Sequence, residues 1–111
     1  MPEQWFVCRT LPKNEAFARV NLRRQGFETF FPRELRPTKY KGRIFDLPVP
    51  IFPNYLFVLF DKALGRWHSI NGTRGVMRLL PTHMEQPIAI PSEVMEELRG
   101  RAEGEIVPYS A

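Results

Sequence analysis

One stretch of the chain breaks the alternation of apolar and polar residues that marks a half-exposed strand. Residues 52–60 read FPNYLFVLF, so that seven of the nine side chains are apolar around Pro53 and Asn54. A strand with one face in water alternates apolar and polar side chains, and this one does not. The pattern therefore predicts a strand with both faces covered. Because the chain has no other long apolar strand, we expect another protein to cover the second face.

Shorter patterns on either side predict both strands and helices. Ala18 and Leu22 stand four positions apart and indicate the buried face of a helix. Asn14 is a good N-cap for this helix, and Gly26 is a natural stop. Gly42, flanked by basic residues, indicates a hairpin turn. The predicted elements are strands over 5–10, 27–32, 52–60 and 76–81, a hairpin within 35–50, a short helix with a tight loop over 61–76, and helices over 15–25 and 91–100.

This order of elements predicts an α+β fold, in which helices pack on a mostly antiparallel sheet of four to five strands. The chain has 111 residues, which suits one domain with a modest core. Its 11 prolines favour short strands and fixed loops. We expect the domain to span residues 1–100. Residues 101–111 lose periodicity, and we expect them to begin a linker, with no packing role for residues 105–111.

Positive charge is concentrated in the first part of the chain. Residues 1–78 hold 14 Lys and Arg against 6 Asp and Glu, whereas residues 79–111 hold 2 against 6. A basic body favours contact with a polyanion such as nucleic acid, although many basic domains bind none. The sequence has no apolar stretch of about 18 residues and no signal-peptide start. We therefore expect a cytoplasmic protein that contacts no membrane.

Residue types that carry catalytic or metal chemistry are few. The single cysteine, Cys8, excludes an internal disulfide and a cysteine-built zinc site, and its apolar surroundings indicate a small buried hydrophobe. His68 and His83 lack a nucleophile or carboxylate at motif spacing, and the acidic residues over 93–97 indicate a solvated helix face. The sequence also lacks a Gly-rich phosphate loop and an HExxH motif. It therefore predicts a protein that is not an enzyme and that holds no metal and no cofactor.

Three segments together resemble the N-terminal domain of the NusG-type transcription elongation factors. They are WFVCRT with a helix ending in LRRQGFETFFP, then IFPNYLFVLF, and then WHSINGTRGVMRLL followed by PIAIPSEVMEEL. The resemblance covers about residues 4–100 in the family's order. FPNYLFV and INGTRGV are most similar to the RfaH type of the family, whereas Trp67-His68 is more similar to the general type.

The resemblance implies that an apolar depression on the sheet grips the clamp helices of the largest catalytic subunit of bacterial RNA polymerase. Tyr55 and Phe57 stand two apart on a strand and share one face, and Leu56 and Val58 share the other. All four also suit packing beneath the domain's own helices. We expect this of Leu56 and Val58, and we expect the other two to face the partner. The positions that match the family's depression are Val7, Phe52, Pro53, Tyr55, Phe57, Met95 and Leu98.

The resemblance also implies a contact with the polymerase gate loop, across the cleft from the clamp. Arg66, Trp67 and His68 match the segment that makes it. This sequence departs from the His-Thr-Thr set of the RfaH type, and Trp67 equally suits the core of the short helix.

Non-template or upstream DNA is the third implied partner. The first helix, the Thr-Arg loop and the basic hairpin match the surfaces that meet it, and a solvated helix face and a solvated hairpin tip are the alternatives. Phe17 and Asn21 stand where RfaH-type members carry basic or histidine side chains. This favours attraction to the DNA backbone over reading of its sequence. The implied nucleic-acid-binding residues are Lys13, Arg24, Gln25, Lys39, Lys41, Arg43, Thr73 and Arg74.

Together these implications describe a monomeric transcription elongation or antitermination factor domain that suppresses pausing or termination. Family members continue through a linker into a C-terminal KOW domain, which recruits termination factor Rho or a ribosomal protein, and this sequence stops where that linker would begin. One alternative is a free-standing nucleic-acid-binding module with an RNA-recognition-like α+β fold, because exposed aromatic residues on a sheet stack bases. The aliphatic character of residues 52–60 and the lack of an RNP-type run disfavour it. A scaffold fragment with no binding of its own is the second alternative.

Overall fold

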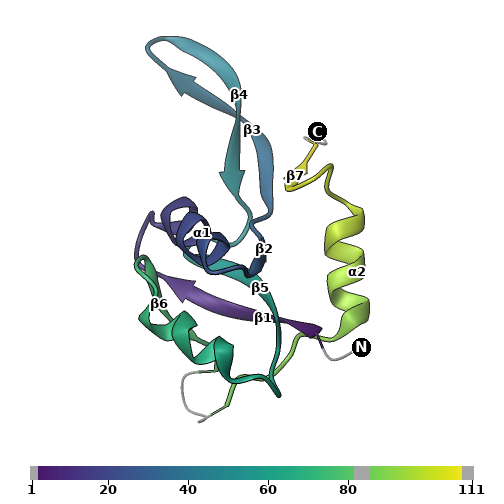
Figure 1. The fold of residues 1–111 in the computed structure, drawn as a ribbon. Helices are drawn as coiled ribbons and strands as arrows, with labels where there is room; N and C mark the ends of the chain where they lie inside the picture. Colours follow the sequence, from purple (N-terminus) through teal and green to yellow (C-terminus); the bar gives the residue numbers. More distant parts are fainter. Residues whose placement is uncertain (1–2, 82–85, 109–111) are drawn as a thin grey trace.

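A computed structural model of the chain describes residues 3–81 and 86–108 (Figure 1). Within these residues the chain forms a four-stranded antiparallel sheet in the order β2-β5-β1-β6, and a second sheet in the order β4-β3-β7. The α+β class and the antiparallel four-stranded sheet are confirmed. No helix among the described residues is long and apolar enough to cross a membrane. The elements are β1 (Glu3–Thr10), α1 (Glu15–Arg24), β2 (Glu28–Phe30), β3 (Arg33–Tyr40), β4 (Arg43–Pro50), β5 (Tyr55–Asp61), the 3-10 helix η1 (Gly65–Gly72), β6 (Val76–Leu79), α2 (Ser92–Gly100) and β7 (Ile106–Val107).

The central strand is β5, the non-alternating apolar run of the sequence. It pairs with β1 on one side and with β2 on the other, so that Phe57 lies between Val7 and Phe30. Leu56 and Val58 lie in the core cluster that α1 and η1 cover. Phe57 lies in a second cluster, which α2 covers on the opposite face. Both faces are therefore covered, as the pattern predicts, but the expectation that a partner alone covers the second face is wrong, because α2 covers much of it.

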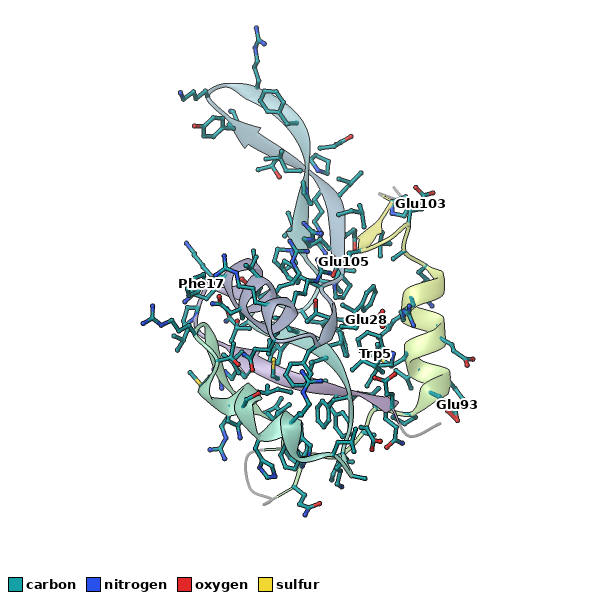
Figure 2. All side chains as sticks on the ribbon, viewed as in Figure 1. Trp5, Phe17, Glu28, Glu93, Glu103 and Glu105 are labelled. Atoms are coloured by element: carbon teal, nitrogen blue, oxygen red, sulfur yellow. The ribbon has the colours of Figure 1, made fainter. Side chains whose placement is uncertain are left out.

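The α2 helix is held on the sheet mainly by Met95. Its side chain is 2% exposed and packs with Trp5, Phe30 and Phe57. Trp5 lies on the α2 side of the sheet (Figure 2), and the guanidinium carbon of Arg99 lies 5.2 Å from the centre of its ring. This packing leaves the rest of the helix face free to border an open surface.

The α1 helix lies on the other face, with Ala18 and Leu22 fully buried as their spacing predicts. Asn14 stands at the N-cap position without a side-chain capping bond. Gly75 allows the helix to approach the loop before β6 closely. Its φ is +91°, and a Cβ atom there would lie 2.9 Å from the backbone nitrogen of Ala18. A glycine is therefore required at this contact.

All four strands predicted from apolar runs have other bounds in the structure: β1 begins at Glu3, β6 ends at Leu79, and β2 and β5 are shorter than predicted. β5 begins at Tyr55 and not at residue 52, because Asn54 has a φ of 72° and closes a turn in which the Tyr55 N–H donates to the Phe52 carbonyl at 3.1 Å. The strand over 27–32 is reduced to β2, because the chain leaves the sheet at Phe31 and enters the hairpin. These departures place Phe52 beside the sheet and not within it.

The β3–β4 hairpin projects from the body of the molecule (Figure 1). Its register runs from the Arg33–Pro50 pair to the Tyr40–Arg43 pair. Lys41 and Gly42 form the two-residue loop with φ of 50° and 79°, and two positive φ values are what a type I′ turn requires. The hairpin at Gly42 is confirmed, but it belongs to a sheet separate from the central one.

Residues 101–107, which we name the C-terminal strap, fold back from α2 onto the base of the hairpin. β7 pairs in parallel with β3, and the Arg33 N–H donates to the Glu105 carbonyl at 2.9 Å. The expectation of no packing role is wrong for residues 105–107, and β7 is a strand that the sequence did not predict. The reason is a set of long-range contacts to Glu105, described below. That a linker and a further domain follow stays a prediction.

Candidate functional site

An apolar groove runs between the β1–β5 face of the sheet and α2. It has a volume of about 370 Å³, and every side chain that lines it is aliphatic or aromatic. The residues of this apolar groove are Val7, Phe52, Tyr55, Phe57, Ile90, Val94 and Leu98. Such a concave apolar surface suits a protein or peptide partner that presents apolar side chains of its own.

Five of the seven residues that the sequence assigned to the depression line the groove; the two that do not are Pro53 and Met95. Pro53 is exposed beside the groove. Met95 is buried beneath it, so it anchors α2 and has little surface to offer a partner. Phe57 is only 7% exposed and forms the floor. The accessible rim comes instead from Phe52, at 37% exposed, and Val94, at 45%.

Two groove residues, Ile90 and Val94, were missed from the sequence. Val94 and Leu98 stand four apart on α2 and share a helix face, so their spacing was a usable signal. Ile90 lies in an extended segment before α2, and its N–H donates to the Trp5 carbonyl at 2.7 Å. Nothing in the local pattern around Ile90 indicates this position.

The turn that carries Phe52 is fixed by a buried carboxylate at the start of α1. Glu15 is 7% exposed, and its Oε2 accepts the Asn54 N–H at 2.8 Å. The Asn54 carbonyl in turn accepts the Thr10 N–H at 2.8 Å. Phe52 then packs edge-on against Phe57, with ring centres 5.8 Å apart. The geometry of the groove therefore depends on a residue that does not line it.

The segment assigned to the gate loop is divided between core and surface. Trp67 is 7% exposed, stacks on Phe60 with ring centres 5.8 Å apart, and donates from Nε1 to the Lys62 carbonyl at 2.9 Å. It is therefore a core residue, the second of the two readings that the sequence left open for Trp67. Arg66 and His68 are exposed, and the His68 ring stacks on Trp67 at 3.9 Å. These two side chains present the surface of η1.

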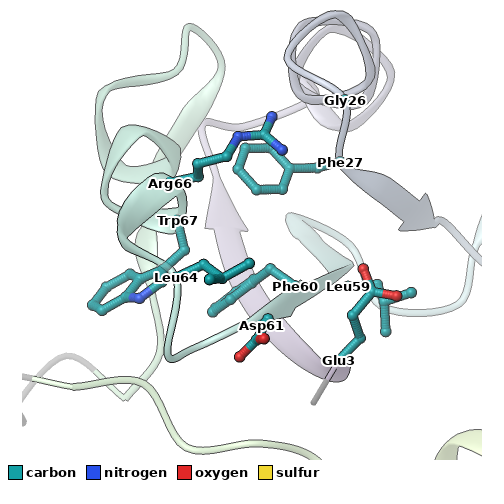
Figure 3. A pocket seen from close by; sticks show the side chains of 9 residues that line it. All are labelled: Glu3, Gly26, Phe27, Leu59, Phe60, Asp61, Leu64, Arg66 and Trp67. Carbon is teal, nitrogen blue, oxygen red and sulfur yellow. The ribbon is translucent and has the colours of Figure 1, made fainter. Parts of the chain in front are cut away.

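A second pocket of about 270 Å³ lies below Arg66 (Figure 3). The Arg66 guanidinium donates to the Gln25 carbonyl, and its carbon lies 5.4 Å from the centre of the Phe27 ring. Glu3 and Asp61, which face each other across β1 and β5, line the opposite side. The mixed charge of this lining favours no single ligand class.

The residues assigned to nucleic acid form two separate groups. In the first, Gln25 donates from Nε2 to the Thr73 hydroxyl at 2.7 Å, and Asn21 donates from Nδ2 to the Arg74 carbonyl at 3.0 Å. These bonds join α1 to the loop before β6, and they leave Arg24 and Arg74 exposed. Thr73 is only 6% exposed and therefore has a structural role. Lys13 is exposed in the loop before α1.

The second group lies at the tip of the hairpin, far from α1 (Figure 1). Lys39, Lys41 and Arg43 are all exposed there. The Lys41 ammonium lies 5.4 Å from the centre of the Tyr40 ring. Exposed cations beside an aromatic ring suit single-stranded nucleic acid, whose backbone carries phosphate charge and whose bases can stack on the ring.

Within the described residues, the cysteine and histidine candidates form no metal site, and Cys8 is a core residue. Cys8 is buried, and burial raises the pKa of its thiol from 9.0 to about 12, so it is a neutral core residue as the sequence predicts. Among residues 3–81 and 86–108, no three His, Cys, Asp or Glu side chains gather closely enough to hold a metal ion. His83 lies outside the described residues.

Comparison with known proteins links this geometry to one family. The family model described as "Transcription termination factor nusG" matches residues 3–99. A solved structure described as "Domain interaction in Thermotoga maritima NusG" is similar with a TM-score of 0.59 and 17% sequence identity. The match covers 91% of this chain but only 59% of that one. At this identity the likeness concerns the fold.

Proposed function

The chain belongs to the NusG family of transcription factors, and on this basis we propose that it binds bacterial RNA polymerase through the apolar groove. The observation that carries the proposal is the incomplete cover of the β1–β5 face. Met95 of α2 is buried, yet Val94, the residue before it, stays 45% exposed and lines the groove together with Phe52. An open apolar groove of this kind suits a helix that inserts apolar side chains at i and i+4.

We place the clamp helices of the largest catalytic subunit in this groove, as the family resemblance implies. A second contact from Arg66 and His68 on η1 would reach the gate loop. These side chains belong to the sheet face that carries α1, whereas the groove belongs to the α2 face. Two contacts on opposite sides of one rigid domain would hold the polymerase cleft closed. A bias of about 1.4 kcal/mol toward the closed state changes the pausing equilibrium about tenfold.

A matched pair of variants tests the groove. Val94→Gln places a polar side chain on the rim, and Val20→Gln makes the same change on α1, where the valine is 43% exposed against 45% for Val94. We expect Val94→Gln to weaken binding to core RNA polymerase about tenfold, because a polar group is desolvated at the contact. Val20→Gln should bind as the native chain does. Equal affinities for the two variants would overturn the proposal.

Salt dependence adds an independent criterion. An apolar contact keeps its affinity as salt rises, whereas one dominated by phosphate charge loses it steeply. We therefore expect the native affinity for polymerase to change little between low and high salt. Phe52→Ala should reduce that affinity at both salt concentrations, and Phe17→Ala, which removes an exposed ring from α1, serves as its control.

The alternative of a free-standing module that stacks bases on its sheet is less well supported. Of the two aromatic side chains of β5 that face away from α1, Phe57 lies under α2 and is only 7% exposed, and Tyr55 is half-buried. Stacking platforms need open ring faces. We propose instead that nucleic acid meets the exposed cations of α1 and of the hairpin tip as an accessory contact.

A further inference from the structure

The carboxylate of Glu105 in the C-terminal strap lies at the centre of three arginines. Its Oε1 is 2.8 Å from Nη1 of Arg19, 3.3 Å from Nη2 of Arg23 and 3.8 Å from Nη2 of Arg33. Its Oε2 accepts the Phe31 N–H. Figure 2 shows Glu105 at the base of the hairpin, beside α1. We name Arg19, Arg23 and Arg33 the arginine cluster.

Each arginine is also held by a contact that does not involve Glu105. Arg23 donates from Nε to the Thr29 hydroxyl at 2.9 Å, and Arg33 donates from Nε to the Phe31 carbonyl at 3.4 Å. The guanidinium carbons of Arg19 and Arg33 lie 5.5 and 5.0 Å from the centre of the Phe31 ring. The arginine cluster is therefore arranged in advance for an anion, which reduces the ordering cost of binding one.

The charges in this cluster are unbalanced. Three guanidinium groups surround one carboxylate, and the Arg19, Arg33 and Glu105 side chains are only 19, 22 and 18% exposed. Burial lowers the pKa of the Arg33 guanidinium, and the charge of Arg19 lowers it further. One carboxylate leaves an excess of two positive charges, whereas successive backbone phosphates each bring a further negative charge, in a geometry that arginine matches.

The element that delivers Glu105 is small. β7 has two residues, and its pairing with β3 covers only Arg33 and Glu34. Short peripheral pairings of this kind open locally at little cost compared with the core. The carboxylate can therefore leave the arginine cluster without unfolding of the domain.

We propose that the arginine cluster is a binding site for the backbone phosphates of single-stranded nucleic acid, and that Glu105 occupies it as an intramolecular competitor. Nucleic acid is the favoured source of phosphate because exposed cations lie on both sides of the cluster along the chain. Exposed Arg24 follows Arg23 on α1, and β3 begins at Arg33 and ends at the hairpin tip, where Lys39, Lys41 and Arg43 are exposed. The proposal deepens the accessory nucleic-acid contact proposed above and does not depend on polymerase binding.

A charge-matched pair of variants tests it. Glu105→Gln keeps the size of the side chain and an acceptor oxygen but removes the charge, and Glu103→Gln makes the same change on an exposed residue of the strap. We expect Glu105→Gln to bind a short labelled single-stranded DNA about tenfold more tightly at about 50 mM salt, with a salt slope steeper by about 0.7 for each added phosphate. Glu103→Gln should gain much less. Equal gains would overturn the proposal.

A double-variant cycle identifies the arginines. Arg19→Gln should change the affinity of the native chain little, because Glu105 already occupies its guanidinium, and should abolish the gain in the Glu105→Gln background. An oligonucleotide with neutral methylphosphonate linkages should show no gain in either background. If Arg19→Gln leaves the gain intact in a chain that melts as the native one does, the arginine cluster is not the phosphate site.

A measurement on the native chain avoids any dependence on folding of the variants. The Phe31 N–H donates to Glu105 and should change its amide resonance when DNA displaces that carboxylate. Titration with single-stranded DNA should shift this resonance, and inorganic phosphate at the same phosphate concentration should not. An unshifted resonance at saturation with DNA, or an equal shift with inorganic phosphate, would overturn the proposal. None of these three experiments uses polymerase. Their failure would therefore be distinct from failure of the proposed polymerase contact at the groove.

Discussion

Removal of the Glu15 carboxylate should disturb the apolar groove without touching its lining. Glu15 is 7% exposed and accepts the Asn54 N–H at 2.8 Å, which fixes the turn between Phe52 and Tyr55. Glu15→Ala leaves this donor without its partner, which costs about 1–3 kcal/mol. It also removes a negative charge from the first turn of α1, worth about 0.3–1 kcal/mol. We expect a total loss of about 2–3 kcal/mol in the free energy of unfolding.

The conservative variant separates the two contributions. Glu15→Gln keeps an acceptor oxygen for Asn54 and loses only the charge, so it should cost about 1 kcal/mol or less. In a domain of this size about 4 °C of melting temperature corresponds to each kcal/mol. Glu15→Ala should therefore melt about 8–12 °C below the native chain and Glu15→Gln about 4 °C below it. Glu3→Ala, which removes an exposed carboxylate, should melt within about 2 °C of it.

Polymerase binding measured below the melting transition completes the test. Glu15→Ala should weaken binding because Phe52 loses its fixed position on the groove rim, and Glu15→Gln should retain most of the affinity. The reasoning is refuted if the two variants melt within about 2 °C of each other. That result would mean that water replaces the carboxylate at the Asn54 N–H and that the turn holds its shape without Glu15.

Three further outcomes follow from the packing. Gly75→Ala should cost about 3 kcal/mol or more in urea unfolding, because φ is +91° and the new Cβ atom would lie 2.9 Å from the Ala18 nitrogen. Met95→Ala should cost about 2–5 kcal/mol, since Met95 is 2% exposed, whereas Val94→Ala should cost about 0.5 kcal/mol or less. The buried Cys8 thiol has its pKa raised from 9.0 to about 12, so the unfolded chain loses this proton first. Stability should be unaffected below pH 9 and should fall by up to about 1.4 kcal/mol per pH unit above it, a slope that Cys8→Ala should reduce.

The sequence indicated that both faces of β5 are covered, but it did not indicate which element covers the second face. The non-alternating run from Tyr55 to Phe60 reflects burial on both faces, and this is a local property. The cover on the second face comes from Met95, about forty positions later, and its place depends on how α2 returns to the sheet. That return is a tertiary contact without a local pattern. The surface left for the proposed partner is consequently narrower than the sequence predicts and lies toward the rim of the groove.

For Trp67 and for the C-terminal strap, the sequence differs in how clearly it indicates the position found in the structure. Trp67 and Ile70 stand three apart and are both buried, so helical spacing favours the core reading of Trp67 over the surface reading that the sequence left open beside it. The strap offers no such signal, because its sequence, RAEGEIV, has no helical or strand periodicity. Glu105 is fixed by arginines from α1 and β3, which the fold alone brings together. A carboxylate held by long-range ion pairs is therefore the feature that sequence periodicity reveals least.

The alternation of side chains along β5 separates the two proposed contacts in space. Tyr55 and Phe57 face α2 and the apolar groove, whereas Leu56 and Val58 face α1 and, beyond it, the exposed cations. Because side chains on a strand alternate strictly, the pairing of β5 with β1 and β2 fixes this division, and a shift by one residue would exchange the two faces. An apolar contact and a charged contact thus act from opposite sides of one buried strand. Each can then be weakened through its own exposed residues, Val94 on one side and Arg24 on the other, while the strand between them stays intact.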